Sequence, residues 1–358
     1  MSYPLLRVHL GVMESNMNEI VKQAGSHGLN IWGVTKGISA PLELALMLER
    51  TGAAALADSR IMNIRRMKNA GIKKPFVLIR IPMRSELPDV LEYTDCCAVS
   101  DLGTMAAISK LCEEKKKEFK ILVMADMGDL REGFWPDEAG AIGAQMKKLS
   151  PALKVEGIGV NFGCASGVLP SYESLSRFVA FGEALEAELG YKLNVYSGGA
   201  TTRSLISLDK HLFPPRVNNL RIGEGYLLGS DKSSGVVIPW LRQDTMELEA
   251  ELVEIRTKPT VPIGEVGFDA FGGKPVFEDR GSRKRGILAV GRQDVRIEGL
   301  TPLDEGVKVI TASSDHLLVD IEDCKKDWQV GDVLRFRPDY GAMLSLSTSQ
   351  YVTKIYEN

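Results

Sequence analysis

Lys36 directly follows an apolar run, Ile31–Thr35, and precedes Gly37. A run of this length and composition predicts a buried β-strand. A helix is then predicted to begin after an N-cap at Ser39 and to end at Gly52. A lysine held among apolar neighbours where a strand meets its helix can lose its proton and attack an aldehyde to form a Schiff base. A lysine that only points into solvent from a loop is the alternative, because most lysines are surface residues.

A second group of residues with possible chemistry lies much later in the chain. The segment Ser197–Arg203 reads Ser-Gly-Gly-Ala-Thr-Thr-Arg. Small residues and hydroxyls at a turn that leads into a helix can bind phosphate through backbone N–H groups and side-chain oxygens. Gly223–Gly225 forms a similar turn just after Arg221. A Gly/Ser/Thr loop alone is more often a plain turn, so this signal needs support from the surrounding elements.

The elements that would position these residues alternate between strands and helices. Helical patterns such as Tyr172–Leu189 separate eight apolar runs that follow a first extended segment at Leu6–Leu10. Such alternation predicts a parallel sheet, and eight strands of this kind predict a closed (β/α)8 TIM-type barrel. An open doubly wound sheet is the alternative, but no GxGxxG motif follows the first strands. The eight predicted strands are Ile31–Thr35, Ala54–Ala57, Phe76–Ile79, Cys97–Val99, Ile121–Met124, Ile158–Val160, Asn194–Tyr196 and Asn219–Ile222.

The pattern changes near Ser230–Gly235, beyond which short strand-like runs alternate with turns. We therefore predict a barrel domain over residues 11–232 and a C-terminal all-β domain over residues 233–358. The predicted strands of the second domain are Gly286–Val290, Val307–Ile310, Leu317–Ile321 and Val333–Phe336.

The overall composition excludes several classes of partner. The chain has 358 residues and a formal net charge of −3, which offers no electrostatic basis for binding nucleic acid or an anionic membrane. No apolar run reaches the roughly 20 residues of a membrane span, and the N-terminus lacks a secretory signal pattern. The five cysteines form no CxxC pair, which favours reduced thiols in the cytoplasm. The four histidines lack metal-ligand spacing, so no metal site is expected.

A closed barrel would bring the two groups of residues together. Its first and eighth strands are neighbours, so Lys36 and Arg221 are expected to face one centre. Barrels commonly place phosphate sites in the loops after strands seven and eight, which is where Ser197–Arg203 and Gly223–Gly225 fall. A Schiff-base lysine, a phosphate anchor and a partner for a ring nitrogen are what pyridoxal 5′-phosphate requires.

With these residues in order, the chain resembles the fold-type-III pyridoxal-phosphate enzymes of the alanine racemase superfamily, and within it the ornithine-racemase-like branch. The resemblance covers nearly the whole length. It is carried by Val34–Lys36, Leu56–Arg60, Ser197–Gly199, Leu220–Glu224, Val261–Gly264, Phe277–Gly281 and Gly291–Val295.

The resemblance implies roles for individual residues. Lys36 would carry the cofactor, and Arg221 would pair with its pyridine nitrogen. Arg131 would lie near the phenolic oxygen of the cofactor and the carboxylate of the substrate. It also implies that Leu6–Leu10 joins the β domain, so that residues 1–10 complete it. The remaining expected cofactor-binding residues are Asn161, Ser197, Thr201, Thr202, Gly223 and Glu224.

The second catalytic base is where the sequence departs from the family pattern. Racemisation needs an acid–base group on each face of Cα, and Lys36 serves only one. In alanine racemases, a tyrosine from the partner's β domain follows a Val-Pro-Ile-Gly-like segment, whereas Val261–Gly264 is followed here by Glu265. Glu265, Cys164 and Tyr340 are therefore the candidates, and the choice between Glu265 and Cys164 stays open.

Arg221 favours racemisation over other pyridoxal chemistry. A guanidinium only donates hydrogen bonds, so it cannot readily protonate the pyridine nitrogen, and the cofactor remains a weaker electron sink. We therefore expect a racemase of free amino acids, with a basic amino acid such as ornithine as the preferred substrate. A homodimer, whose active sites are completed by the partner's β domain, is also expected.

Two alternatives to racemisation remain at this stage. A decarboxylase of the same fold is one, although the tail lacks a Cys-Glu-Ser-Gly-Asp signature. A non-catalytic pyridoxal-phosphate homeostasis protein is the other, although such proteins lack a β domain.

Overall fold

The computed structural model describes residues 2–358, which form two compact units. One unit spans Leu10–Gln243, and the other combines the N-terminal segment through His9 with Asp244–Asn358. This division falls later than the predicted boundary at residues 232 and 233. The reason is a hairpin of β10 (Ser230–Asp231) and β11 (Val236–Val237), after which the Ile238 amide donates to the Gly229 carbonyl at 2.9 Å. These bonds keep the segment in the first unit.

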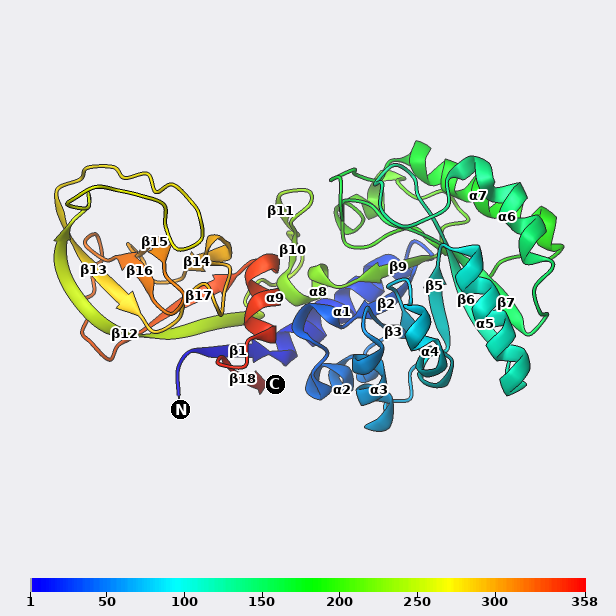
Figure 1. Cartoon of the computed structure of the whole chain (residues 1–358), viewed down its shortest axis with the longest axis horizontal. Helices are drawn as coiled ribbons and strands as arrows, with labels where there is room; N and C mark the ends of the chain where they lie inside the picture. The colour runs from blue at the N-terminus through cyan, green and yellow to red at the C-terminus, as the bar shows by residue number, and fades with distance from the viewer. Residues whose placement is uncertain (1) are drawn as a thin grey trace. The chain divides into compact units, whose positions relative to one another are not determined.

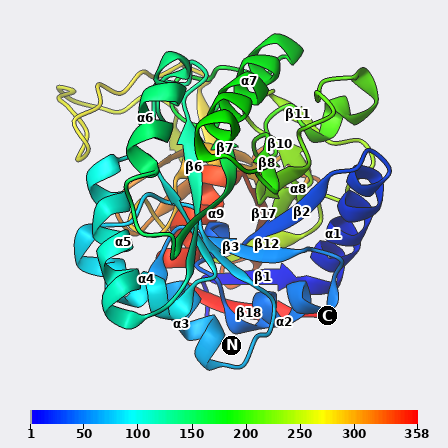
Figure 2. The same ribbon diagram turned by 90° about the vertical axis from the view of Figure 1, so that its right-hand side faces the viewer.

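The first unit is the predicted closed barrel of eight parallel strands. Figure 2 shows its helices α1–α7 around the outside of the strands. The strands are β2 (Asn30–Val34), β3 (Ala55–Asp58), β4 (Phe76–Leu78), β5 (Cys96–Val99), β6 (Phe119–Ala125), β7 (Leu153–Val160), β8 (Val195–Ser197) and β9 (Asn219–Ile222). The helices are α1 (Leu10–Gly25), α2 (Leu42–Arg50), α3 (Ile61–Asn69), α4 (Leu87–Tyr93), α5 (Leu102–Lys115), α6 (Ala139–Met146), α7 (Tyr172–Leu189) and α8 (Glu224–Leu228).

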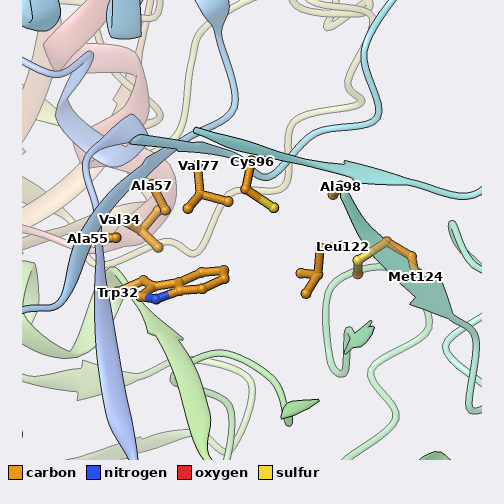
Figure 3. Packing of buried hydrophobic residues seen from close by; sticks show 9 residues of the cluster. All are labelled: Trp32, Val34, Ala55, Ala57, Val77, Cys96, Ala98, Leu122 and Met124. Atoms are coloured by element: carbon orange, nitrogen blue, oxygen red, sulfur yellow. The ribbon is translucent and has the colours of Figure 1, made fainter. Parts of the chain in front are cut away.

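The barrel interior is filled by alternate residues of its strands. Figure 3 shows Trp32 and Val34 of β2 facing Leu122 and Met124 of β6 across this core. Arg221 of β9 lies opposite Trp32 in the parallel register, so its side chain points to the same interior face. The alternation of side chains along β9 therefore directs the Arg221 side chain into the barrel interior.

The helix after β2 begins later than the sequence predicted. Ser39 does not cap it, because Ser39 and Ala40 both adopt positive φ values of 60° and 49°. Lys36 instead opens a short 3-10 helix, Lys36–Ile38, and Pro41 occupies the N-cap position of α2. The two left-handed residues turn the chain between these helices, which lets Lys36 stay at the barrel mouth.

The second unit is built on an eight-stranded sheet, ordered β14-β17-β12-β13-β16-β15, with β1 between β12 and β18. Figure 1 shows β1 in blue, β12 in yellow-green and the strands from β13 onward in yellow-orange to red. Their bounds are β1 (Leu5–His9), β12 (Met246–Pro259), β13 (Ser282–Leu288), β14 (Leu300–Pro302), β15 (Lys308–Ala312), β16 (Leu317–Asp320), β17 (Val333–Pro338) and β18 (Thr353–Glu357). The unit also contains helix α9 (Tyr340–Thr348), capped by Asp339, which the sequence reading did not predict. Within residues 2–358, no helix combines the length and apolarity that a membrane span requires.

Candidate active site

Lys36 follows the carboxyl end of β2, whose Trp32 and Val34 face the barrel interior. Its side chain is solvent-accessible, yet protein atoms surround it closely in the concave barrel mouth. This crowding lowers the pKa of Lys36, and the positive charge of Arg131 lowers it further, while Cys164, Asp58 and Glu132 oppose the shift. A larger fraction of the amine is therefore neutral, which is the nucleophilic form.

Asp58 supports the strand ends beneath Lys36. Its buried carboxylate accepts hydrogen bonds from the Thr35 hydroxyl at 2.6 Å, the Arg60 amide at 2.8 Å and the Asn63 side-chain amide at 3.1 Å. Burial raises the pKa of Asp58, and these three donors oppose that shift. Tyr226 adds a bond from its hydroxyl to the Val34 carbonyl at 2.8 Å. Together these contacts fix the backbone on either side of the lysine.

Arg221 is held by both of its terminal nitrogens. Nη1 donates to the Ser197 hydroxyl and, at 3.3 Å, to the Ser197 carbonyl. Nη2 donates to the Val160 carbonyl at 2.6 Å and to Oδ1 of Asn161 at 2.9 Å. These four bonds use all four Nη hydrogens, which leaves the Nε hydrogen as the remaining donor. Burial lowers the pKa of Arg221 to about 10, so the guanidinium stays charged at neutral pH.

Arg131 reaches the same mouth from the loop after β6. Both oxygens of the neighbouring Glu132 carboxylate accept hydrogen bonds from Arg131, through Nε and Nη2. Glu132 Oε1 also accepts from the Asn161 side-chain amide at 2.9 Å. A continuous series of hydrogen bonds therefore joins Arg131 to Arg221 through Glu132 and Asn161.

Cys164 is held at the mouth by Asp129, a buried residue of the same β6 loop. The Asp129 carboxylate accepts hydrogen bonds from three successive amides, those of Cys164, Ala165 and Ser166, at 3.1–3.2 Å. The exposed Cys164 thiol interacts electrostatically with Lys36, Arg131 and Arg221. The thiol is thus within electrostatic range of one lysine and two arginines of the barrel mouth.

The Ser197–Arg203 loop packs closely against the start of α8. The Thr201 hydroxyl accepts a hydrogen bond from the Gly225 amide at 3.1 Å, and a Cβ at Gly225 would lie 2.7 Å from Leu205. The Thr202 hydroxyl donates to Ser233 Oγ at 3.3 Å, and Ser233 donates in turn to the Gly163 carbonyl at 3.3 Å. The hairpin residue Ser233 therefore links this loop to the Cys164 loop.

Glu224 contributes its backbone to this turn, while its side chain points to the hairpin. Its carboxylate accepts hydrogen bonds from the Ser230 hydroxyl at 2.9 Å and the Lys232 amide at 2.7 Å. Burial raises the pKa of Glu224 from 4.5 to about 7, and the charge of Asp231 adds to that shift.

Glu224→Gln is expected to remove a pH-dependent loss of stability. An acid whose pKa is raised in the folded state binds more protons folded than unfolded, so wild-type stability falls between pH 4.5 and about 7. Glutamine keeps the accepting oxygen without the charge, so the variant gains stability relative to wild type above pH 7, by up to about 3 kcal/mol. Thermal unfolding across this pH range measures the difference, with the exposed Glu43→Gln variant as control. Parallel profiles for wild type and Glu224→Gln would contradict the expectation.

Of the candidate site residues singled out in the sequence, the barrel unit contains all except Glu265 and Tyr340, and Tyr340 is the first residue of α9 in the other unit. Glu265 belongs to the other compact unit, on an exposed segment of residues 260–281 between β12 and β13, so it is not among the residues that the barrel brings together. Sequence reasoning missed Glu132 and Asp129. The only sequence feature that pointed to these two residues was the number of Asp and Glu residues close to Arg131. A solvent-exposed loop would have the same composition.

Comparison with known proteins places this geometry in a family. The family model described as alanine racemase, N-terminal domain, matches residues 8–230. A lysine racemase from Thermotoga maritima is 42% identical over 100% of this chain and 99% of its own length. An ornithine racemase from Acetoanaerobium sticklandii is 37% identical over 98% of this chain and 99% of its own length. The crystal structure of an alanine racemase from Streptomyces lavendulae has the same fold, with a TM-score of 0.78 at 17% identity over 100% of this chain and 98% of that one. The chain therefore belongs to the alanine racemase family.

Proposed function

We propose that this chain is a pyridoxal-phosphate-dependent racemase that interconverts the enantiomers of a basic amino acid, lysine or ornithine. The single observation that supports it most strongly is the pair of full-length relatives, a lysine racemase and an ornithine racemase. The site adds support, because the Lys36 amine and the Cys164 thiol interact electrostatically at the barrel mouth.

The residues of the mouth fit the expected cofactor. Lys36 offers an amine of lowered pKa for the aldehyde carbon. The free Nε hydrogen of Arg221 suits an unprotonated pyridine nitrogen, and the hydroxyls of Thr201 and Thr202 with the amides of Gly223 and Glu224 suit a phosphate. When bound, pyridoxal phosphate delocalises the negative charge that remains after the Cα proton leaves.

The remaining residues divide the reaction between the two faces of Cα. Arg131 holds the α-carboxylate of the substrate, which orients Cα between Lys36 and Cys164. One of these groups removes the Cα proton, and the other returns a proton to the opposite face. Arg221 limits side reactions because its guanidinium does not give the ring nitrogen a proton.

This proposal is tested by incubating the holoenzyme with L-lysine, L-ornithine and L-alanine and resolving the enantiomers by chiral chromatography. The D-isomer of a basic amino acid is expected, with a rate well above that for alanine and no release of carbon dioxide. Carbon dioxide without D-isomer would support the decarboxylase alternative. A stably bound cofactor that racemises none of the amino acids would support the non-catalytic alternative.

We further propose that the enzyme is a homodimer, with the segment of residues 260–281 seated on a second copy. This segment exposes Ile263, Phe268 and Val276 by 96%, 76% and 94%, which is costly for a surface that remains in water. A second copy would cover these side chains and bring Glu265 toward the barrel mouth of the partner subunit.

The five free cysteines are in keeping with a location in the reducing cytoplasm.

Replacing Ile263 and Phe268 with aspartate is expected to convert dimers to monomers and to lower racemisation. Analytical ultracentrifugation and activity measure these effects, with circular dichroism to show that the fold is kept. A fully active monomeric wild type would contradict the proposed dimer.

A further inference from the structure

Glu132 is the point at which the two arginines of the mouth are joined. Its carboxylate is partly buried, with 18% of the side chain exposed, and it pairs with Arg131 through both oxygens. One of these oxygens also accepts the hydrogen bond from the Asn161 amide at 2.9 Å. One carboxylate therefore contacts Arg131 directly and reaches Arg221 through a single intervening side chain.

The pair with Glu132 determines which edge of Arg131 faces the mouth. Glu132 takes the edge formed by Nε and Nη2, while Nη1 donates to no other group within residues 2–358. A guanidinium has two edges that can each bind a carboxylate with two parallel hydrogen bonds. Glu132 thus occupies one edge and leaves the other available to an incoming α-carboxylate.

The hydrogen bond from Asn161 to Glu132 holds the nitrogen end of the Asn161 amide. An amide group has a donating nitrogen and an accepting oxygen. Because Glu132 accepts only, it binds the nitrogen, and the oxygen is then directed to Nη2 of Arg221 at 2.9 Å. Without this carboxylate, the amide nitrogen would lose its acceptor, and only the hydrogen bond from Nη2 of Arg221 would hold the amide. Glu132 and Arg221 therefore fix the orientation of Asn161 together, one from each end of the amide.

We propose that Glu132 is a positioning residue that holds Arg131 for the substrate carboxylate and, through Asn161, holds Arg221 for the ring nitrogen of the cofactor. The inference rests on the proposed function and deepens it. In this proposal, the loop after β6 links the binding of the substrate carboxylate to the hydrogen bonding of the cofactor's ring nitrogen.

Glu132→Gln separates this role from a purely structural one. The glutamine NH2 would face a guanidinium N–H donor, so the two-bond pair with Arg131 cannot form. We expect the KM for the basic amino acid to rise roughly 10- to 100-fold, as for loss of a charged hydrogen bond, with a smaller change in kcat. We also expect the pH titration of the visible absorbance of the bound cofactor to shift without substrate present.

Asn161→Ala provides the second arm of the test. It is expected to reproduce the shift in the absorbance titration but not the rise in KM, because Arg131 keeps its pair with Glu132. The double variant should show no larger absorbance shift than either single variant, since both changes act through one series of contacts. Glu14→Gln is the matched control, because Glu14 forms a similar two-bond pair with Arg50 on the barrel exterior.

The outcomes are distinguishable from a failure of the proposed function, which the wild type alone would reveal by lacking cofactor or racemisation. With an active wild type, unchanged KM and unchanged absorbance titration in Glu132→Gln would overturn the inference. So would additive absorbance shifts in the double variant. If Glu132→Gln does not fold, Glu132→Asp, which keeps the charge on a shorter side chain, and Asn161→Ala supply the same comparison.

Discussion

Lys36→Ala is expected to abolish both the covalent attachment of pyridoxal phosphate and racemisation. Lys36 supplies the lysine amine at the carboxyl end of β2. Burial among protein atoms lowers the pKa of this amine, so a larger fraction of it is in the neutral, reactive form. Loss of the attachment point and of one acid–base group should reduce racemisation by at least about 10³-fold. Borohydride reduction followed by peptide mass spectrometry measures the attachment.

The matched control for this variant is Lys74→Ala. Lys74 is also a lysine whose pKa burial lowers, but it precedes β4 and donates to the Thr51 and Ala53 carbonyls. It therefore lies at the amino end of the strands, opposite the candidate site. Lys74→Ala should retain the reducible linkage. A reducible linkage that survives in Lys36→Ala would show that another residue carries the cofactor.

Cys164→Ala is expected to cause the second-largest loss, because it removes the proposed base on one face of Cα. Such a group typically contributes about 10²–10⁴-fold. The diagnostic result concerns proton exchange rather than rate alone. In D2O, the variant should still exchange the α-proton of the one enantiomer whose proton faces Lys36, but it should not convert it to the other enantiomer.

Cys324→Ala is the control for the loss of a thiol, because Cys324 is partly exposed and belongs to the other unit. It should racemise as the wild type does. If Cys164→Ala also racemised at the wild-type rate, the second base would have to be sought elsewhere, and Glu265 of a partner subunit would then be the next candidate.

Much of the fold could be predicted from the sequence because parallel strands in a barrel are short, apolar and regularly separated by helices. The predicted helix Tyr172–Leu189 has the bounds of α7, which the structure shows capped by Ser171 and ended by Gly190 in a left-handed conformation. The sheet of the second unit was harder to predict. The long strand β12 alternates glutamate with apolar residues at its start and ends in the polar run Arg256–Lys258 before Pro259, so it lacks a continuous apolar signal.

The candidate site was predictable where a residue follows directly from its strand. Lys36 follows β2 and Arg221 lies on the neighbouring strand β9, so the closed barrel brings both to its interior. The contacts of Glu132 and Asp129 could not be predicted in this way. Both depend on how the loop after β6 folds onto the loop after β7, and hydrogen bonds between side chains and distant amides leave no periodic pattern in a sequence.

The measurement that tests the central claim most directly is the isotopic content of the product in the first turnover. L-lysine or L-ornithine would be racemised in D2O and the D-isomer analysed by mass spectrometry. With Lys36 and Cys164 on opposite faces, the proton removed and the proton returned are different, so the product should carry deuterium at Cα from the first turnover. A product that retains the original protium would show that one group serves both faces and would contradict the account.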